Sequence, residues 1–180
     1  MTEPDVVVTA WLAGLAAALR GEADSDVACG TCTACCRSQQ FIHIEPDEAD
    51  ALAHIPSALR FPAPGMPQGH VLMGYDERGS CPMLGEHGCT IYAHRPRTCR
   101  VYDCRVFAVA GVFPDEPEKA DIAARARRWQ VVTDGVEDEA ALAAVHGHVA
   151  RLAAAEPDLP ATPLAVRSCR AVTEARPVDD

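Results

Sequence analysis

Hydrophobic positions recur at near-helical spacing at the start of the chain and again near its end. Over residues 5–20 they include Leu12 and Leu15, which predicts an amphipathic helix that packs on the core. Residues 115–129 and 136–155 are predicted to form further helices. Beyond them we expect a loosely held tail over residues 156–180, because prolines stand at positions 157, 160, 163 and 177.

The middle of the chain has shorter apolar runs. Residues 41–44 and 71–75 predict strands, and Pro46 before two acidic residues predicts a helix that continues to Ile55. A proline-rich loop is expected from residue 56 to 67, and residues 81–104 are expected to form turns. The expected fold class is therefore α+β, with a small irregular cysteine-rich core of short strands and metal-bound loops, enclosed by about four helices.

Length and charge narrow the class of protein. With 180 residues, of which 48% are hydrophobic, the chain can bury one ordinary core, so residues 1–180 are expected to form a single domain. Within it, residues 29–104 would form the metal-binding core and residues 115–155 the C-terminal helices. Acidic residues number 26 against 16 basic ones, the wrong balance for binding a nucleic-acid backbone, so no nucleic-acid partner is expected.

The N-terminal segment predicts a cytoplasmic protein without a membrane partner. It lacks the basic start and the small-residue cleavage site of a secretory signal. The longest apolar stretch, residues 6–19, is shorter than the roughly 20 residues that span a bilayer. Cytoplasmic cysteines are kept reduced, so clustered thiols there more often bind metal than form disulfides.

The nine cysteines carry the candidate chemistry. Cys29, Cys32 and Cys35 are separated by two residues each, and a tight turn brings such sulfurs beside one ion. Cys36 directly follows Cys35, and neighbouring side chains diverge, so the two thiols are predicted to serve different centres. Cys169 is expected to be a spare thiol. The eight predicted metal ligands are Cys29, Cys32, Cys35, Cys36, Cys81, Cys89, Cys99 and Cys104.

Arginine follows four of the cysteines directly, at positions 37, 100, 105 and 170, and Arg95 and Arg97 lie between Cys89 and Cys99. These cations could neutralise bound thiolates. Alternatively, they pair with carboxylates such as Asp103 or Glu86. His87 and His94 lie in the second cysteine group and are predicted to be loop residues or to support the site rather than to replace a thiol.

The motif Cys29-x2-Cys32-x2-Cys35-Cys36 is followed by Cys81-Pro, Cys89-x-Ile-Tyr, Arg95-Pro-x-x-Cys99-Arg and Cys104. This series resembles the bacterial cysteine-cluster family that carries the CxxCxxCC signature and is described as a zinc- or iron-chelating domain. All eight family cysteines have a counterpart here, over about residues 29–104. The resemblance implies metal chelation. Flagellin lysine methylases carry the same signature, which implies the alternative of an iron–sulfur-dependent enzyme.

The spacing of the cysteines is compatible with either metal. Cys29, Cys32 and Cys35 repeat the first three ligands of the bacterial ferredoxin run, which holds a 4Fe–4S cluster with a distant fourth cysteine. Paired cysteines also suit closed four-thiolate zinc sites. The expected cofactor is therefore iron, including a 4Fe–4S cluster, or zinc. The chain lacks the common sequence motifs of hydrolases, P-loop proteins and dinucleotide-binding enzymes, so the sequence predicts a metal-binding protein, with any protein partner unidentified.

Overall fold

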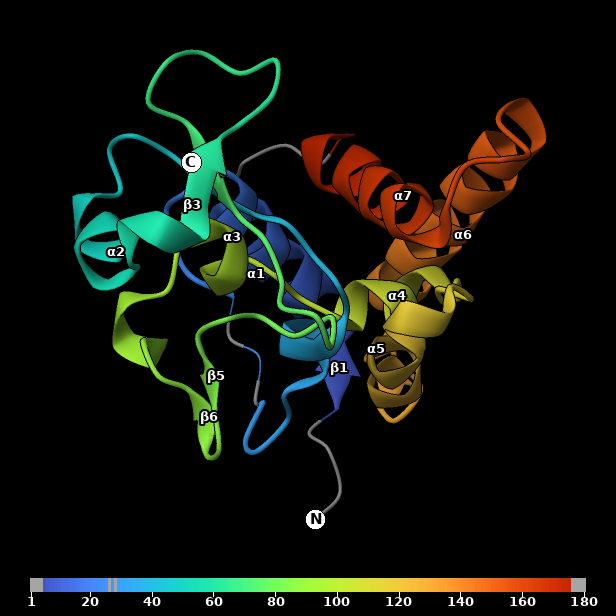
Figure 1. The fold of residues 1–180 in the computed structure, drawn as a ribbon. Helices are drawn as coiled ribbons and strands as arrows, with labels where there is room; N and C mark the ends of the chain where they lie inside the picture. The colour runs from blue at the N-terminus through green and yellow to red at the C-terminus, as the bar shows by residue number, and fades with distance from the viewer. Residues whose placement is uncertain (1–4, 26, 28, 176–180) are drawn as a thin grey trace. The chain divides into compact units, whose positions relative to one another are not determined.

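A computed structural model describes residues 5–25, 27 and 29–175 (Figure 1). The chain divides into two compact units, where the sequence predicts one domain. We call the first the helical unit, made of Met1–Ala28, Asp103–Glu116 and Ile122–Asp180. We call the second the cysteine unit, made of Cys29–Tyr102 and Pro117–Asp121.

The helical unit is built mainly from α-helices. The strand β1 (Val6–Val7) pairs in parallel with β7 (Val131–Val132) and leads directly into the first helix. Its helices are α1 (Val8–Leu19), α4 (Arg105–Ala110), most of α5 (Ala120–Ala126), α6 (Val136–Ala155) and α7 (Ala161–Ala175). The predicted helices at residues 5–20 and 136–155 are confirmed, the second with the expected bounds.

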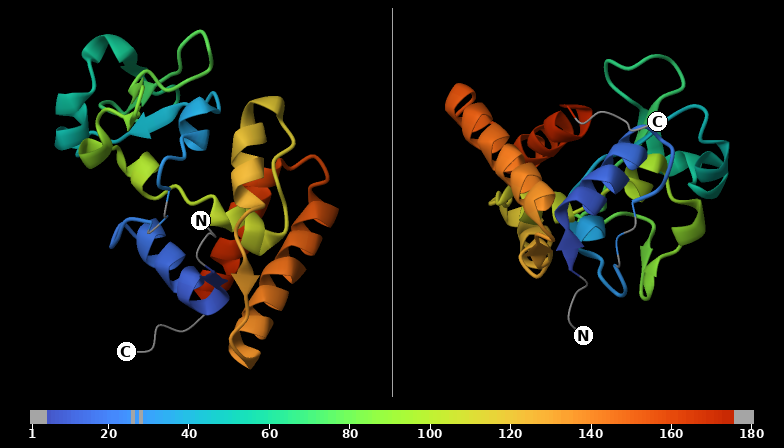
Figure 2. Two further views of the ribbon diagram at one scale, coloured as in Figure 1. Left: turned by 90° about the horizontal axis from the view of Figure 1, so that it is seen from below. Right: turned by 180° about the vertical axis from the view of Figure 1, so that it is seen from behind.

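Helix α7 packs against α6, α4 and α1, as can be followed in the two views of the chain in Figure 2. This helix corrects the expectation of a loose tail for residues 161–175, and residues 176–180 of that expected tail lie outside the described residues. Pro163 lies in the first turn of α7, where a helix needs no hydrogen bond from the backbone nitrogen, so the proline does not interrupt it. The buried face of α7 follows the helical repeat and consists of Leu164, Ala165, Ser168, Cys169 and Val172.

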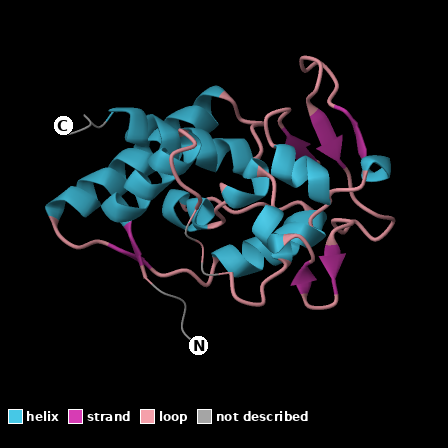
Figure 3. Ribbon diagram, turned by 90° about the vertical axis from the view of Figure 1, so that its left-hand side faces the viewer, coloured by secondary structure: helices cyan, strands magenta, loops and turns pink. Residues whose placement is uncertain are grey.

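Short strands and single-turn helices make up the cysteine unit (Figure 3). Strands β2 (Ile42–Ile44), β4 (Val71–Met73) and β3 (Arg60–Pro62) form an antiparallel sheet in that order. This confirms both predicted strands, and β3 lies in the segment expected to be a loop. The other elements are η1 (Ala34–Arg37), α2 (Ala49–His54), η2 (Ser57–Leu59), β5 (Leu84–Gly85), β6 (Gly88–Cys89), η3 (Tyr92–His94), α3 (Arg97–Arg100) and η4 (Pro117–Lys119).

The cysteine unit has a small aliphatic core. Its buried side chains come from β2, β4, α2 and the loop before η3, and they are Ile42, Ile44, Ala51, Ile55, Met73 and Ile91. The α+β class is confirmed, and the described residues form seven α-helices rather than about four. None of the helices in the described part of the chain is long and apolar enough to cross a membrane.

A buried carboxylate joins α1 to α6 within the helical unit. Asp138 is 2% exposed, and its two oxygens accept hydrogen bonds of 2.7 Å from the backbone N–H groups of Thr9 and Asp134. It lies in the first turn of α6, where a negative charge also interacts favourably with the helix dipole. The carboxylate therefore holds the starts of both helices.

We predict that Asp138→Asn lowers the free energy of unfolding by about 2 kcal/mol, because an amide can accept only one of these bonds and turns a donor toward the other N–H group. Denaturant unfolding followed by circular dichroism measures the effect. Glu139→Gln is the matched control, since Glu139 is the exposed neighbour. Equal stability of the two variants would contradict the assigned role of Asp138.

Candidate metal centre

Three cysteines of the second group lie around the hairpin β5–β6 and helix α3. Cys81 precedes β5, Cys89 ends β6 and Cys99 lies in α3. All three pack against the aliphatic core of the cysteine unit, although they are separated by up to 18 residues in the sequence. The core therefore brings thiols from separate segments to one place.

The first cysteine group is connected to this place through the backbone. The N–H group of Cys32 donates to the carbonyl of Cys29 at 2.9 Å, which confirms the predicted tight turn, and Gly30 adopts a positive φ of 55° in it. Cys35 and Cys36 lie in η1. The N–H group of Cys81 donates to the carbonyl of Cys36 at 2.7 Å, so the loop before β5 is fixed against η1.

Four thiols influence one another electrostatically, although among the described residues no three sulfurs lie within 4.8 Å of one another. Burial raises the pKa of the Cys99 thiol to about 12, and the sulfurs of Cys35, Cys81 and Cys89 are the next contributors. Burial also raises the pKa of Cys81, again with contributions from Cys89 and Cys35. We call Cys35, Cys81, Cys89 and Cys99 the four-thiol cluster.

Cys36 interacts with Cys35, which is a member of the four-thiol cluster. A hydrogen bond between the two side chains raises the pKa of the Cys35 thiol, and burial raises it further. The prediction that these adjacent thiols serve different centres stays a prediction.

A cation accompanies the four-thiol cluster. Arg95 acts on Cys99 in the direction that lowers the thiol pKa, opposing the effect of burial. Its guanidinium carbon lies 3.6 Å from the centre of the Tyr92 ring, and its Nε is buried without a hydrogen-bond partner among the described residues. Arg95 therefore has the place and charge to offset negative sulfur, as the sequence predicts.

Other arginines form ion pairs with carboxylates, which is the second of the two roles expected for them from the sequence. Arg97 binds Glu45 at 2.6 Å, and Arg105 binds Asp103 at 2.8 Å. The second pair lies in the helical unit, where the Asp103 carboxylate also accepts a 2.8 Å hydrogen bond from the indole of Trp11. These ion pairs connect structural elements to one another.

Cys104 and Cys169 belong to the helical unit. Cys104 is buried, and its sulfur accepts a 3.4 Å hydrogen bond from the indole nitrogen of Trp129. Cys169 is fully buried in α7, and burial raises the pKa of its thiol to about 12. This environment agrees with the expectation that Cys169 is a packed thiol, not a ligand.

The histidines of the second cysteine group lie on the surface. His87 is exposed in the turn between β5 and β6. His94 donates from Nδ1 to the carboxylate of Asp50 at 2.9 Å, which holds the pKa of that carboxyl below its ordinary value. Asp50 and His54 are not among the predicted site residues, and their i,i+4 spacing on the predicted helix is the sequence signal that indicates them.

Comparison with protein families matches residues 28–126 to the CxxCxxCC family, described as a "putative zinc- or iron-chelating domain". The match covers more than half of the chain, so the chain belongs to this family and the resemblance drawn from the cysteine spacing is confirmed. Comparisons with curated proteins and with solved structures found no match. Family membership supports metal chelation, with zinc and iron as the two metals.

We predict that Cys99→Ala loses bound metal whereas Cys169→Ala retains it, because only Cys99 belongs to the four-thiol cluster. Inductively coupled plasma mass spectrometry gives the metal content per chain after purification under argon, and circular dichroism checks that both variants fold. Equal metal content in the two variants would show that Cys99 is not a ligand.

Proposed function

We propose that this protein binds zinc or iron through the four-thiol cluster of its cysteine unit. The observation that carries the proposal is that Cys81, Cys89 and Cys99 pack against one aliphatic core, and that Cys35, Cys81 and Cys89 all add to the raised pKa of the Cys99 thiol. A set of four sulfurs supplies the full number of ligands for a closed tetrahedral ion.

The chemistry of the donor set fits both metals that the family description names. Thiolates are soft ligands that suit zinc, iron and iron–sulfur clusters. Four thiolates on a divalent ion leave a local charge near −2, which partly buried surroundings disfavour unless a cation lies close. Arg95 supplies such a cation. The assignment of Cys29, Cys32, Cys36 and Cys104 as ligands stays a prediction from the sequence.

We infer that the metal mainly stabilises the cysteine unit. A site closed by four protein ligands has no open position for a substrate, and such zinc sites are usually structural. The strands of the unit have two or three residues each, and six side chains form its buried core. The function also requires a reducing compartment such as the cytoplasm, because thiols oxidised to disulfides cannot bind metal.

The proposal predicts about one zinc or iron equivalent per chain, or about four iron atoms with equivalent acid-labile sulfide if a 4Fe–4S cluster is bound. Elemental analysis and the visible absorption spectrum of protein purified without oxygen distinguish these cases. Protein that contains neither metal and has freely reactive thiols at the four-thiol cluster would contradict the proposed function.

Metal removal should unfold the cysteine unit selectively. Structural zinc contributes about 10–16 kcal/mol of apparent binding energy at neutral pH, and this becomes folding energy where the metal-free site is not preformed. We expect a chelator to abolish the hydrogen-exchange protection of β2 and β4, whereas amides of α6 and α7 remain protected because those helices bury their own side chains. Unchanged protection of β2 and β4 would show that the metal does not hold the fold.

A further inference from the structure

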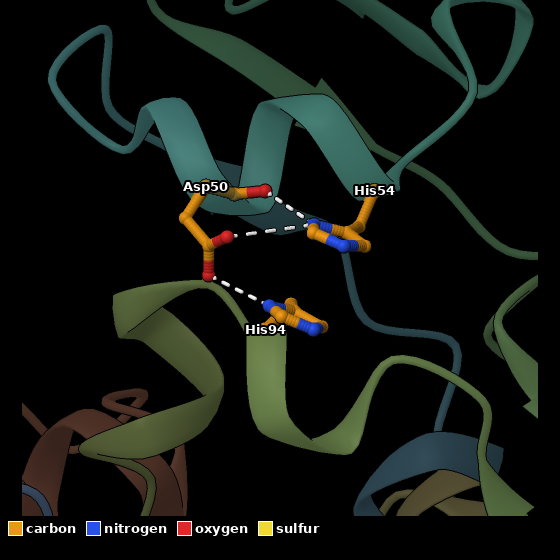
Figure 4. Close-up of side chains that lie close together, drawn as sticks. All are labelled: Asp50, His54 and His94. Atoms are coloured by element: carbon orange, nitrogen blue, oxygen red, sulfur yellow. Dashed lines mark hydrogen bonds and ion pairs between the residues drawn. The ribbon is translucent and has the colours of Figure 1, made fainter.

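Three side chains outside the four-thiol cluster converge on one point at the surface of the cysteine unit (Figure 4). Asp50 and His54 lie one turn apart on α2, and His94 comes from η3. His94 Nδ1 is 2.9 Å from Oδ2 of Asp50, and His54 Nδ1 is 3.5 Å from Oδ1 of the same carboxylate. Two imidazoles therefore direct the same nitrogen toward one carboxylate.

The separations between these atoms match those between ligands of one metal ion. One ligand atom from each of the three residues lies within 4.8 Å of the other two. Ligands bound tetrahedrally at about 2.0–2.1 Å are about 3.3–3.5 Å apart, and the two nitrogen–oxygen distances of 2.9 and 3.5 Å lie close to that range. The imidazole rings are stacked with their centres 3.5 Å apart and their planes 5° from parallel. Because each nitrogen lone pair lies in the plane of its ring, at least one ring must rotate about its Cβ–Cγ bond before both can bind one ion.

We propose that Asp50, His54 and His94 form a second metal site, which binds a divalent first-row transition ion such as Zn²⁺ or Fe²⁺. The carboxylate and the two Nδ1 atoms would be the ligands, and each neutral imidazole would keep its single proton on Nε2. His54 Nδ1 also lies 2.9 Å from the carbonyl oxygen of Asp50, a contact that the bound ion would replace.

The donor set indicates what kind of site this is. Imidazole and carboxylate are harder ligands than thiolate, so the site does not compete directly for a metal that prefers sulfur. Three protein ligands leave at least one coordination position open, as in catalytic zinc sites and in iron sites with two histidines and one carboxylate. The side chain of Asp50 is 68% exposed, so water or a small ligand can reach that position.

The cysteine unit contains a second stacked histidine pair, which serves as a comparison for His54 and His94. His43 and His70 are also stacked, with ring centres 5.1 Å apart and planes 1° from parallel. Their rings bond to each other, with His43 Nε2 2.9 Å from Nδ1 of His70. Among the described residues, only the group with Asp50 brings a third potential ligand to a histidine pair.

The experiment titrates Zn²⁺ into the metal-loaded full chain while the histidine ring nitrogens are followed by ¹⁵N NMR. Nδ1 of His54 and His94 should shift on binding, whereas the rings of His43 and His70 should not. Asp50→Asn should weaken this binding at least about tenfold, and His70→Gln should leave it unchanged within about twofold.

Zn²⁺ binding that leaves the His54 and His94 nitrogens unshifted would overturn the proposal, as would equal affinity of Asp50→Asn and the unaltered chain. Because the Asp50 side chain is exposed, Asp50→Asn should keep the fold, and circular dichroism checks this. The ring-nitrogen signals report on this site alone, so the result does not depend on whether the four-thiol cluster binds metal.

Discussion

The cysteine unit depends on a conflict between packing and charge. Its small aliphatic core draws Cys81, Cys89 and Cys99 together, but thiolates held so close and partly out of water repel one another. Burial is the main cause of the raised pKa of Cys99, and the neighbouring sulfurs add to it. In the proposed function, a bound metal ion would remove this cost by replacing several protons with one divalent charge.

The fold was predictable where periodicity alone decides it. The apolar repeat located α1 and α6, and alternating Ile42 and Ile44 located β2 with His43 on the less buried face. Helix α7 was not predicted because prolines in and around it suggest a break, whereas the one proline inside the helix, Pro163, lies in its first turn and is tolerated there. The pairing of β1 with β7 joins residues 125 positions apart, and two-residue strands leave no pattern that could indicate such a partner.

The sequence predicted that thiols are the candidate ligands, but it did not predict which of the thiols lie together. Residue types and spacing identified thiols as metal ligands, and the family match agrees with that chemistry. Which sulfurs lie together depends on where the hairpin β5–β6 and the backbone bond from Cys81 to Cys36 place them, and these are tertiary features. In the same way, the spacing of Asp50 and His54 is visible in the sequence, whereas the approach of His94 from η3 is not.

The discontinuity of the helical unit has a consequence for the order of events on the ribosome. Helix α1 is synthesised early, yet its packing partners α6 and α7 are synthesised late. Until they emerge, the apolar side chains of Trp11, Leu12 and Leu15 have no final surface to bury against. All four thiols of the four-thiol cluster are synthesised by Cys99, and the cysteine unit is complete by Asp121, before α6 and α7. In the proposed function, the cysteine unit could therefore bind its metal while the helical unit is still being made.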